Sequence, residues 1–354
     1  MNKNIYSVIA ASGSYIPEKI VPNSDFLSNI FYDSDGKVIE VSNEEIMTNL
    51  SIETEDLGKH YGDVRAVEHL SLQVAEGEIY AFLGLNGAGK TTTIRMLLGM
   101  IRPTTGYANV LQTRVRLGSR EPWEGVGYLV EAPHCYPELS VFDNLEVARR
   151  LHPGTPRQAV SQIIERMGLA EYAGRRSGNL SQGNAQRLGL AKALLHNPRL
   201  IFLDEPANGL DPAGIVEIRE LLLELTREQG VTVFMSSHIL AEVARLAQRV
   251  GIIHNGRLIQ ELDMAELERN RKRRLLLKAR DGQAACQALA AAGQPAELQA
   301  DGSLELTGVG AVERPEDIAS LLVRAGTPPT QLLVEEEELE QYFLRLVGAQ
   351  EAQK

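Results

Sequence analysis

Short apolar runs alternate with helical patterns between residues 53 and 265. Continuous apolar runs at residues 79–83 and 200–203 and a largely apolar run at 231–235 predict buried strands, and the pattern at 92–100 predicts a helix. Strands that alternate with helices are typical of βαβ units. This part of the chain is therefore predicted to be an α/β domain built around a mainly parallel sheet.

The pattern changes after residue 265. A basic run at 269–274 marks a boundary, and in so acidic a chain it fits a solvated helix end or linker better than a membrane or nucleic-acid patch. Strands are then expected at 274–279, 304–307 and 332–334, and helices at 283–292, 315–325 and 336–347. This order suggests a β-α-β-β-α-β, ferredoxin-like α+β accessory domain over residues 266–354.

The composition is ordinary for a soluble globular protein. The chain has 354 residues, of which 44% are hydrophobic and 23% charged, and this length fits two or three domains. The formal net charge of −11 argues against a nucleic-acid partner held by a basic surface. No apolar run reaches the roughly 18 to 20 residues that cross a bilayer, and we expect no secretory signal. Cys135 and Cys286 indicate a reducing, cytoplasmic setting and lack the clustered neighbours of a metal site.

Residues 84–91 read Gly-Leu-Asn-Gly-Ala-Gly-Lys-Thr and match G-x-x-x-x-G-K-[ST] at every fixed position. The loop follows a predicted strand and precedes a predicted helix, which is the context of a phosphate site. Glycines let backbone N–H groups converge on phosphate oxygens, and the helix N-terminus adds a positive dipole end. Lys90 is expected to reach the β- and γ-phosphates of a nucleoside triphosphate, and the Thr91 hydroxyl to bind Mg²⁺.

Three other segments extend this candidate site. A strand ending in Asp204 would place that carboxylate at the edge where the loop opens, to hold Mg²⁺ through water. Glu205 would orient or deprotonate the attacking water. Ser181 is a predicted N-cap and Gly183 permits close backbone approach, so this helix start is either a second anion site or an ordinary capped helix. His238 follows a strand and can donate to a γ-phosphate, although a lone histidine there also fits a structural role.

Taken together in this order, the motifs resemble those of the ATP-binding subunit of an ABC transporter. The resemblance covers residues 53–265 closely and the remaining C-terminal residues more weakly. The segment LSQGN, which begins at Leu180, is similar to the signature motif of this family. The segment NGLD, which ends at Asp211, is similar to the D-loop, and His238 is similar to the switch histidine. Tyr61 is similar to the aromatic residue that stacks on adenine, with an ordinary surface tyrosine as the alternative. The resemblance implies a P-loop NTPase cassette with a helical subdomain.

The resemblance also implies a mechanism. Two cassettes associate head to tail, each ATP lies between residues 84–91 of one copy and 181–183 of the other, and hydrolysis lets the cassettes part. A homodimer would contain two equivalent sites, and a heterodimer with a related subunit is the alternative. The implied nucleotide-binding residues are Tyr61, Gly84, Asn86, Gly87, Gly89, Lys90, Thr91, Thr92, Ser181, Gly183 and Asp211.

Residue 131 departs from the family pattern. Family members usually have a glutamine after the corresponding strand, whereas residues 127–130 are here followed by Glu131. A glutamate can still offer oxygen to Mg²⁺ or water, but the metal must offset its repulsion from the phosphates. Glu131 therefore joins Thr91 and Asp204 as a candidate metal ligand. The substitution resembles the subgroup that exports bacitracin-like and lantibiotic peptides, or is a neutral change in a generic exporter.

The leading interpretation is an ATPase that drives export through a separate membrane permease. It would be cytoplasmic and peripheral on the inner face of the cell membrane, with residues 131–150 near the permease. The alternative is a soluble ABC-class ATPase that acts on ribosomes or DNA. Such proteins usually carry two cassettes in one chain or long coiled coils, and neither feature is present in this sequence.

Residues 1–52 are polar and turn-rich and do not resemble a cassette. Residues 6–18 and 21–33 resemble the opening of ketoacyl-ACP synthase III. The Cys-His-Asn site of that enzyme is not carried over, because Cys135 and Cys286 have the wrong surroundings. A piece of about 50 residues cannot bury the core of that family alone. We interpret it as an appended fragment that ATP binding does not require.

Overall fold

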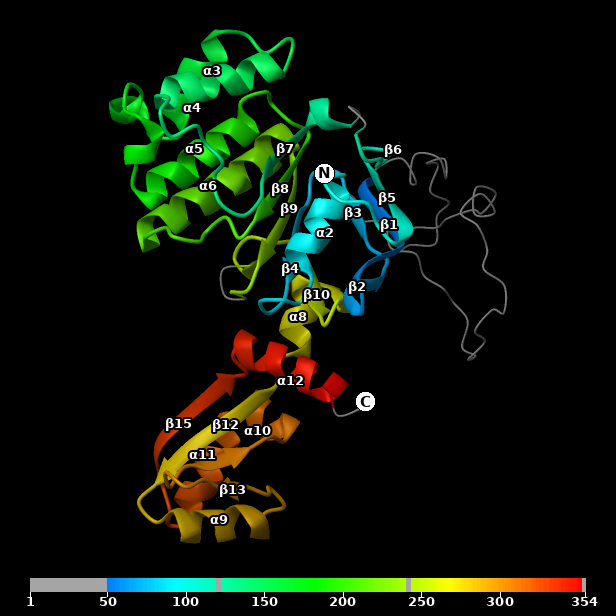
Figure 1. Ribbon diagram of the computed structural model, residues 1–354. Helices are drawn as coiled ribbons and strands as arrows, with labels where there is room; N and C mark the ends of the chain where they lie inside the picture. The colour runs from blue at the N-terminus through cyan, green and yellow to red at the C-terminus, as the bar shows by residue number, and fades with distance from the viewer. Residues whose placement is uncertain (1–49, 119–121, 240–242, 352–354) are drawn as a thin grey trace, which may run out of the picture. The chain divides into compact units, whose positions relative to one another are not determined.

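The computed structural model describes residues 50–118, 122–239 and 243–351 (Figure 1). The described residues divide into two compact units. The first contains the residues up to Ile79 and those from Gly89 to Met235, and the second contains Tyr80–Ala88 and the residues from Ser236 onward. Most of the glycine loop therefore belongs to the second unit, and the helix that follows it belongs to the first.

The first unit contains an antiparallel sheet. Its hydrogen-bonded order is β2-β1-β5-β6, and β3 also pairs with β1. The strands are β1 (Leu50–Tyr61), β2 (Val64–Leu70), β3 (Gln73–Ala75), β5 (Thr105–Val110) and β6 (Thr113–Arg114). Ile52 and Thr54 of β1 are buried, whereas Glu53 and Glu55 are more exposed. This alternation is expected for a sheet with one covered face.

Three further strands of the first unit are hydrogen-bonded in the order β9-β8-β7. They are β7 (Val126–Leu129), β8 (Leu200–Asp204) and, up to Met235, β9 (Thr232–Ser237). Every residue of β8 and β9 is buried, as expected for strands covered on both faces. β7 and β8 run parallel with Leu129 opposite Leu203. The parallel pairing and the intervening helices confirm the predicted α/β class.

Among its described residues the first unit contains five α-helices, three of which begin at a polar side-chain cap. They are α2 (Lys90–Leu97), α3 (Val141–Leu151), α4 (Gln158–Arg166), α5 (Gln182–Leu194) and α6 (Pro212–Gln229). Ser140, Ser181 and Asp211 each accept a hydrogen bond from the backbone N–H three residues later, which satisfies a donor that the helix leaves free. Helices α3, α4 and α5 pack against one another (Figure 1).

The second unit contains strand β10 between β4 and β11. β4 (Ile79–Leu83) pairs with β10 (Arg249–His254) in parallel, and β11 (Arg257–Asp263) pairs with β10 antiparallel. Helix α8 (Met264–Asn270) begins at Asp263, which forms a reciprocal capping box with Glu266. The buried strand β4 leads directly into the glycine loop, as the sequence predicted.

The rest of the second unit contains an antiparallel sheet of order β13-β14-β12-β15. Its elements are β12 (Arg273–Ala279), α9 (Gly282–Ala291), β13 (Glu297–Leu298), β14 (Leu304–Leu306), α10 (Val309–Glu313), α11 (Pro315–Arg324), β15 (Pro329–Glu336) and α12 (Leu339–Glu351). Leu275 and Leu277 of β12 pack with Leu289 of α9 and Leu322 of α11 in a buried core. The expected β-α-β-β-α-β order is present, while the short elements β13 and α10 were not predicted.

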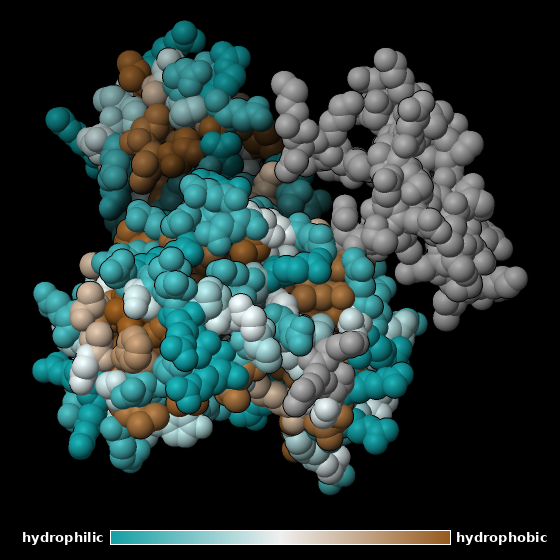
Figure 2. Space-filling view, turned by 90° about the horizontal axis from the view of Figure 1, so that it is seen from above, coloured by the Kyte–Doolittle hydropathy of each residue, from teal (hydrophilic) through white to brown (hydrophobic). Residues whose placement is uncertain are grey.

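Among the described residues, none of the helices combines the length and the apolar character that a membrane span requires. Hydrophilic residues cover most of the face shown in Figure 2, and hydrophobic residues show between them in smaller groups. This surface agrees with a chain in which 23% of the residues are charged.

Candidate functional site

The glycine loop is shaped by close backbone packing. A Cβ on Gly84 would lie 2.6 Å from the carbonyl oxygen of Ile253, so a larger residue would not fit. Gly87 and Gly89 have φ angles of 83° and 111°, a region that residues with a Cβ rarely adopt. Asn86, which immediately precedes Gly87, is exposed. The backbone therefore requires the glycines of the motif.

Helix α2 begins at Lys90 with a first turn that suits an anion. Gly89 at the N-cap provides no side-chain hydrogen bond, and the first turn contains no acidic residue. The Lys90 side chain is 6% exposed, and its Nζ lies 3.2 Å from Glu205 Oε1. A helix start without a capping side chain, beside a buried ammonium group, fits the phosphates of a nucleotide.

Thr91 and Asp204 meet at the start of the same helix. Thr91 Oγ1 donates a hydrogen bond to Asp204 Oδ2 at 2.8 Å. Asp204 is the last residue of β8 and is 3% exposed. Mg²⁺ takes hard oxygen ligands, usually one or two carboxylates together with substrate phosphates and water. This hydroxyl and carboxylate therefore fit the metal that the motif predicts.

Two glutamates occupy equivalent places after neighbouring strands. Leu129 of β7 lies opposite Leu203 of β8, and Glu131 and Glu205 each follow two residues later. Both glutamates have left-handed backbone conformations, with φ angles of 59° and 50°. Residues with a Cβ seldom adopt this region, and such strain is often found at functional sites. The structure thus brings both acidic candidates to the same end of this strand pair.

Glu131 is paired with an arginine of α2. Arg95 Nη2 lies 2.5 Å from Glu131 Oε1, and the two side chains are 39% and 50% exposed. From the sequence we expected a metal to offset the charge of Glu131, whereas the structure pairs Glu131 with the guanidinium group of Arg95. Arg95 was not predicted as part of the site. It follows Thr91 by four residues, so its place on the same helix face was available from the sequence.

The signature segment lies at the start of α5. Ser181 is the N-cap, its Oγ accepts a hydrogen bond from Asn184 N at 3.3 Å, and Gly183 lies in the first turn. One turn later, the buried Gln186 donates from Nε2 to the carbonyl oxygen of Pro206 at 3.0 Å. Gln186 therefore connects the signature helix to the segment that follows β8. Gln186 follows the LSQGN segment by two positions, and its sequence context alone did not indicate this contact.

The other predicted residues have different surroundings. Asp211 is the N-cap of α6, and its Oδ1 accepts a hydrogen bond from a backbone N–H at 2.9 Å. Its carboxylate therefore caps a helix in this structure. Tyr61 ends β1, is 49% exposed, and has Lys59 Nζ 5.0 Å from its ring centroid. Thr92 is half-buried in the first turn of α2, and His238 is exposed after β9 in the second unit. Tyr61 thus presents an aromatic face that could contact a base.

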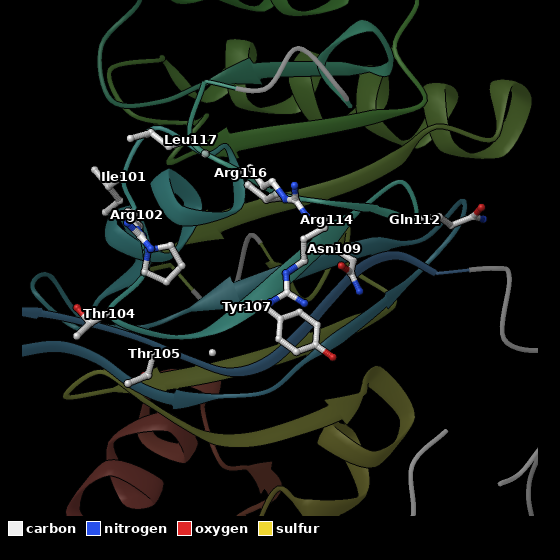
Figure 3. A pocket seen from close by; sticks show the side chains of 14 residues that line it. Ile101, Arg102, Thr104, Thr105, Tyr107, Asn109, Gln112, Arg114, Arg116 and Leu117 are labelled. Carbon is white, nitrogen blue, oxygen red and sulfur yellow. The ribbon is translucent and has the colours of Figure 1, made fainter. Parts of the chain in front are cut away.

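A hollow of about 1130 Å³ lies on the antiparallel sheet of the first unit (Figure 3). None of the predicted site residues lines it. Tyr107 Oη donates to Glu55, Asn109 Nδ2 donates to Glu53 at 2.9 Å, and the Arg114 guanidinium lies 3.5 Å from the Tyr107 ring centroid. Three polar residues of the lining, Tyr107, Asn109 and Arg114, thus have partners within the protein.

Comparison with known proteins agrees with the geometry of the site. A family model described as ABC transporter matches residues 67–208. The chain is 38% identical over 299 residues to the bacitracin transport ATP-binding protein BcrA of Bacillus licheniformis, an alignment that covers 84% of this chain and 97% of BcrA. It is 36% identical over 210 residues to the lantibiotic transport ATP-binding protein SrtF of Streptococcus pyogenes, covering 59% of this chain and 90% of SrtF.

A solved structure supports the same fold. The chain is similar to cbiO1 from Clostridium perfringens, described as part of the ABC transporter complex cbiONQ, at 26% identity and a TM-score of 0.56. This similarity covers 63% of this chain and 92% of cbiO1.

Fold and site together define a P-loop ATPase that binds ATP. The chain belongs to the ABC transporter family, as an ATP-binding transport subunit. The family, the cassette fold and the ATPase activity predicted from the motifs are therefore confirmed. The relatives also confirm the resemblance to bacitracin and lantibiotic transport subunits.

Proposed function

We propose that this chain powers the export of a bacitracin-like antimicrobial peptide through a separate membrane permease. The observation that carries the proposal is the alignment with BcrA, which spans 97% of that protein at 38% identity. The family model matches only residues 67–208, so the likeness to BcrA extends well beyond the ATPase motifs. Glu131, at a position where family members usually have a glutamine, also supports membership of the bacitracin- and lantibiotic-exporting subgroup.

Nucleotide binding begins on the glycine loop and α2. Lys90 leaves Glu205 and contacts the β- and γ-phosphates, while N–H groups of the loop donate to the same oxygens. Glu205, no longer paired with Lys90, then orients the attacking water or accepts its proton. Catalysis rests mainly on this positioning and on charge stabilisation.

Thr91 and Asp204 are the proposed Mg²⁺ ligands, and Glu131 is a third oxygen donor. Bound Mg²⁺ would neutralise phosphate charge as the γ-phosphate is transferred to water. Asp204→Asn should raise the Mg²⁺ concentration needed for half-maximal ATP hydrolysis. Glu131→Gln should shift the same titration, and an unchanged titration would remove Glu131 from the metal site.

Two chains are proposed to enclose each nucleotide. Ser181 and Gly183 begin a helix whose N–H groups suit a γ-phosphate bound on the partner. Tyr61 stacks on the adenine, His238 donates to the γ-phosphate, and Asp211 lies at the interface. Because one chain contains one glycine loop and one signature, a homodimer completes two equivalent sites, whereas a heterodimer needs a related subunit.

The proposed partner is a permease that carries the membrane spans. The chain would then be held on the cytoplasmic face of the cell membrane by this permease, with residues 131–150 near the contact. The net charge of −11 gives no support for a nucleic-acid partner.

The domain division is part of the proposal. We assign residues 53–265 to the ATPase domain, 266–354 to the accessory domain and 1–52 to an appended fragment. β1 begins at Leu50, a few residues before the proposed start of the ATPase domain. The likeness to ketoacyl-ACP synthase III concerns the fragment, which up to residue 49 lies outside the described residues.

Coexpression with a candidate polytopic permease from the same genome tests the export proposal. We expect the two proteins to copurify and the cells to survive higher bacitracin concentrations. Glu205→Gln is the matched control, because it should copurify but give no protection. An assembled, ATP-hydrolysing complex that gives no protection would refute the peptide cargo, and failure to hydrolyse ATP would refute the whole proposal.

A further inference from the structure

Two cations of α2 face the two carboxylates that follow β7 and β8. Lys90 lies 3.2 Å from Glu205, and Arg95 lies 2.5 Å from Glu131. The first pair is nearly buried, and the second is partly exposed. One helix therefore supplies a separate positive charge to each of two glutamates that occupy equivalent positions on neighbouring strands.

Arg95 also shares a helix face with the proposed metal-binding threonine. Thr91 and Arg95 are four residues apart in α2, which places Arg95 about 6 Å further along the same face. On that face Thr91 donates its hydrogen bond to Asp204. Glu131, paired with Arg95, is therefore held on the side of α2 where the phosphate and metal ligands gather.

We propose that Arg95 is a positioning residue, which holds Glu131 in place and cancels its charge beside the nucleotide phosphates. This inference rests on the nucleotide site proposed above. Without Arg95, the Glu131 carboxylate would repel the phosphates, whereas the Arg95–Glu131 pair is electrically neutral. A partly exposed ion pair contributes little to folding stability, so its loss should change nucleotide affinity more than unfolding.

A double-mutant cycle on the full chain tests the inference. The variants are Arg95→Met, Glu131→Gln and the combination of both, and the probe is ADP, titrated calorimetrically with and without Mg²⁺. We expect Arg95→Met to weaken metal-free ADP binding about threefold, because a carboxylate near the phosphates loses its counter-charge. Added Mg²⁺ should reduce the defect, and the double variant should bind as tightly as Glu131→Gln.

Two controls separate positioning from a merely structural role. Arg95→Lys keeps the positive charge and should restore most of the affinity. Arg116→Met removes an exposed arginine for which the described contacts include no ion pair, and should bind ADP like the unaltered chain. Urea unfolding of each variant should show similar stability, and Arg95→Met should raise the KM for ATP with little change in kcat.

The possible outcomes are distinct. A double variant as weak as Arg95→Met would mean that Arg95 does not act through Glu131, which overturns the inference. A loss of stability that accounts for the loss of affinity would overturn it as well. If the unaltered chain bound no nucleotide, the proposed site itself would fail, independently of Arg95.

Discussion

The ammonium group of Lys90 lies 3.2 Å from the carboxylate of Glu205, and the two side chains are 6% and 17% exposed. Buried ion pairs add little net stability, because desolvation offsets their attraction, but removing one partner leaves an uncompensated charge. In the proposed mechanism Lys90 leaves this pair to meet a phosphate. Nucleotide binding would then be coupled to the freeing of Glu205 for catalysis.

Glu205→Gln should bind ATP at least as tightly as the unaltered chain and hydrolyse it at least about 100-fold more slowly. Binding is retained because Lys90 no longer needs to leave a carboxylate, and turnover is lost because the amide cannot accept a proton from water. Calorimetry and phosphate release measure the two effects. Glu228→Gln, a change of an exposed glutamate, should alter neither. Undiminished turnover in Glu205→Gln would refute its catalytic role.

Lys90→Ala should lose affinity for ATP and should also disturb the fold, because Glu205 is left in a nearly buried place without its cation. The double variant Lys90→Ala/Glu205→Gln removes both charges. We expect urea unfolding to show that the double variant is more stable than Lys90→Ala alone. Equal stability of these two variants would contradict the coupling.

Asp211 has a structural role that can be separated from any role in nucleotide binding. Asp211→Ala removes the N-cap of α6 and should lower the free energy of unfolding by about 1 kcal/mol, whereas Asp211→Asn keeps a capping oxygen and should have a smaller effect. Urea unfolding measures the difference. If both variants lose ATPase activity at unchanged stability, the carboxylate acts at the interface between cassettes instead.

The stacked pair of His152 and His196 predicts a loss of stability in acid. Their ring centroids are 3.8 Å apart, and His196 Nε2 lies 3.1 Å from the carbonyl oxygen of Val126. Burial lowers the pKa of His196 to about 4 and also lowers the pKa of His152. The unfolded chain takes up a proton near pH 6.5, before the folded chain does, so acid favours unfolding.

We therefore expect the free energy of unfolding to fall as the pH is lowered from about 7 to about 5, measured by urea titration. Neutral His196 makes its full contribution to stability when the pH lies above the pKa that this residue has in the unfolded chain. The contribution is lost as the pH falls toward the pKa of about 4 that His196 has in the folded chain. His196→Gln keeps a donor for Val126 and should show a shallower dependence on pH. The same slope in both proteins would exclude His196 as the cause.

Deleting residues 1–49 should leave ATP binding and hydrolysis unchanged. The first described strand begins at Leu50, and the alignment with BcrA covers 97% of that relative while using 84% of this chain. ATP binding by calorimetry and ATPase assays on the full and shortened chains make the comparison. A shortened chain that folds but binds no ATP would show that the division of the chain is wrong.

Much of the nucleotide site could be read from consecutive residues. A phosphate loop needs glycines, a lysine and a hydroxyl within eight positions between a strand and a helix, and residues 84–91 provide them locally. The longer helices and strands from β12 onward were also predicted, because hydrophobic periodicity indicates helix or strand without knowledge of their partners, whereas the short elements β13 and α10 were not.

Contacts between distant segments were not accessible in this way. Arg95 meets Glu131 across 36 positions of sequence, and Gln186 meets Pro206 across 20. These pairs depend on the register of β7 against β8 and on where each helix begins, which no single segment encodes. The local sequence pattern therefore predicted a phosphate site. The pairing of Arg95 with Glu131 and of Lys90 with Glu205 was decided only by tertiary packing, which brings side chains from distant segments together.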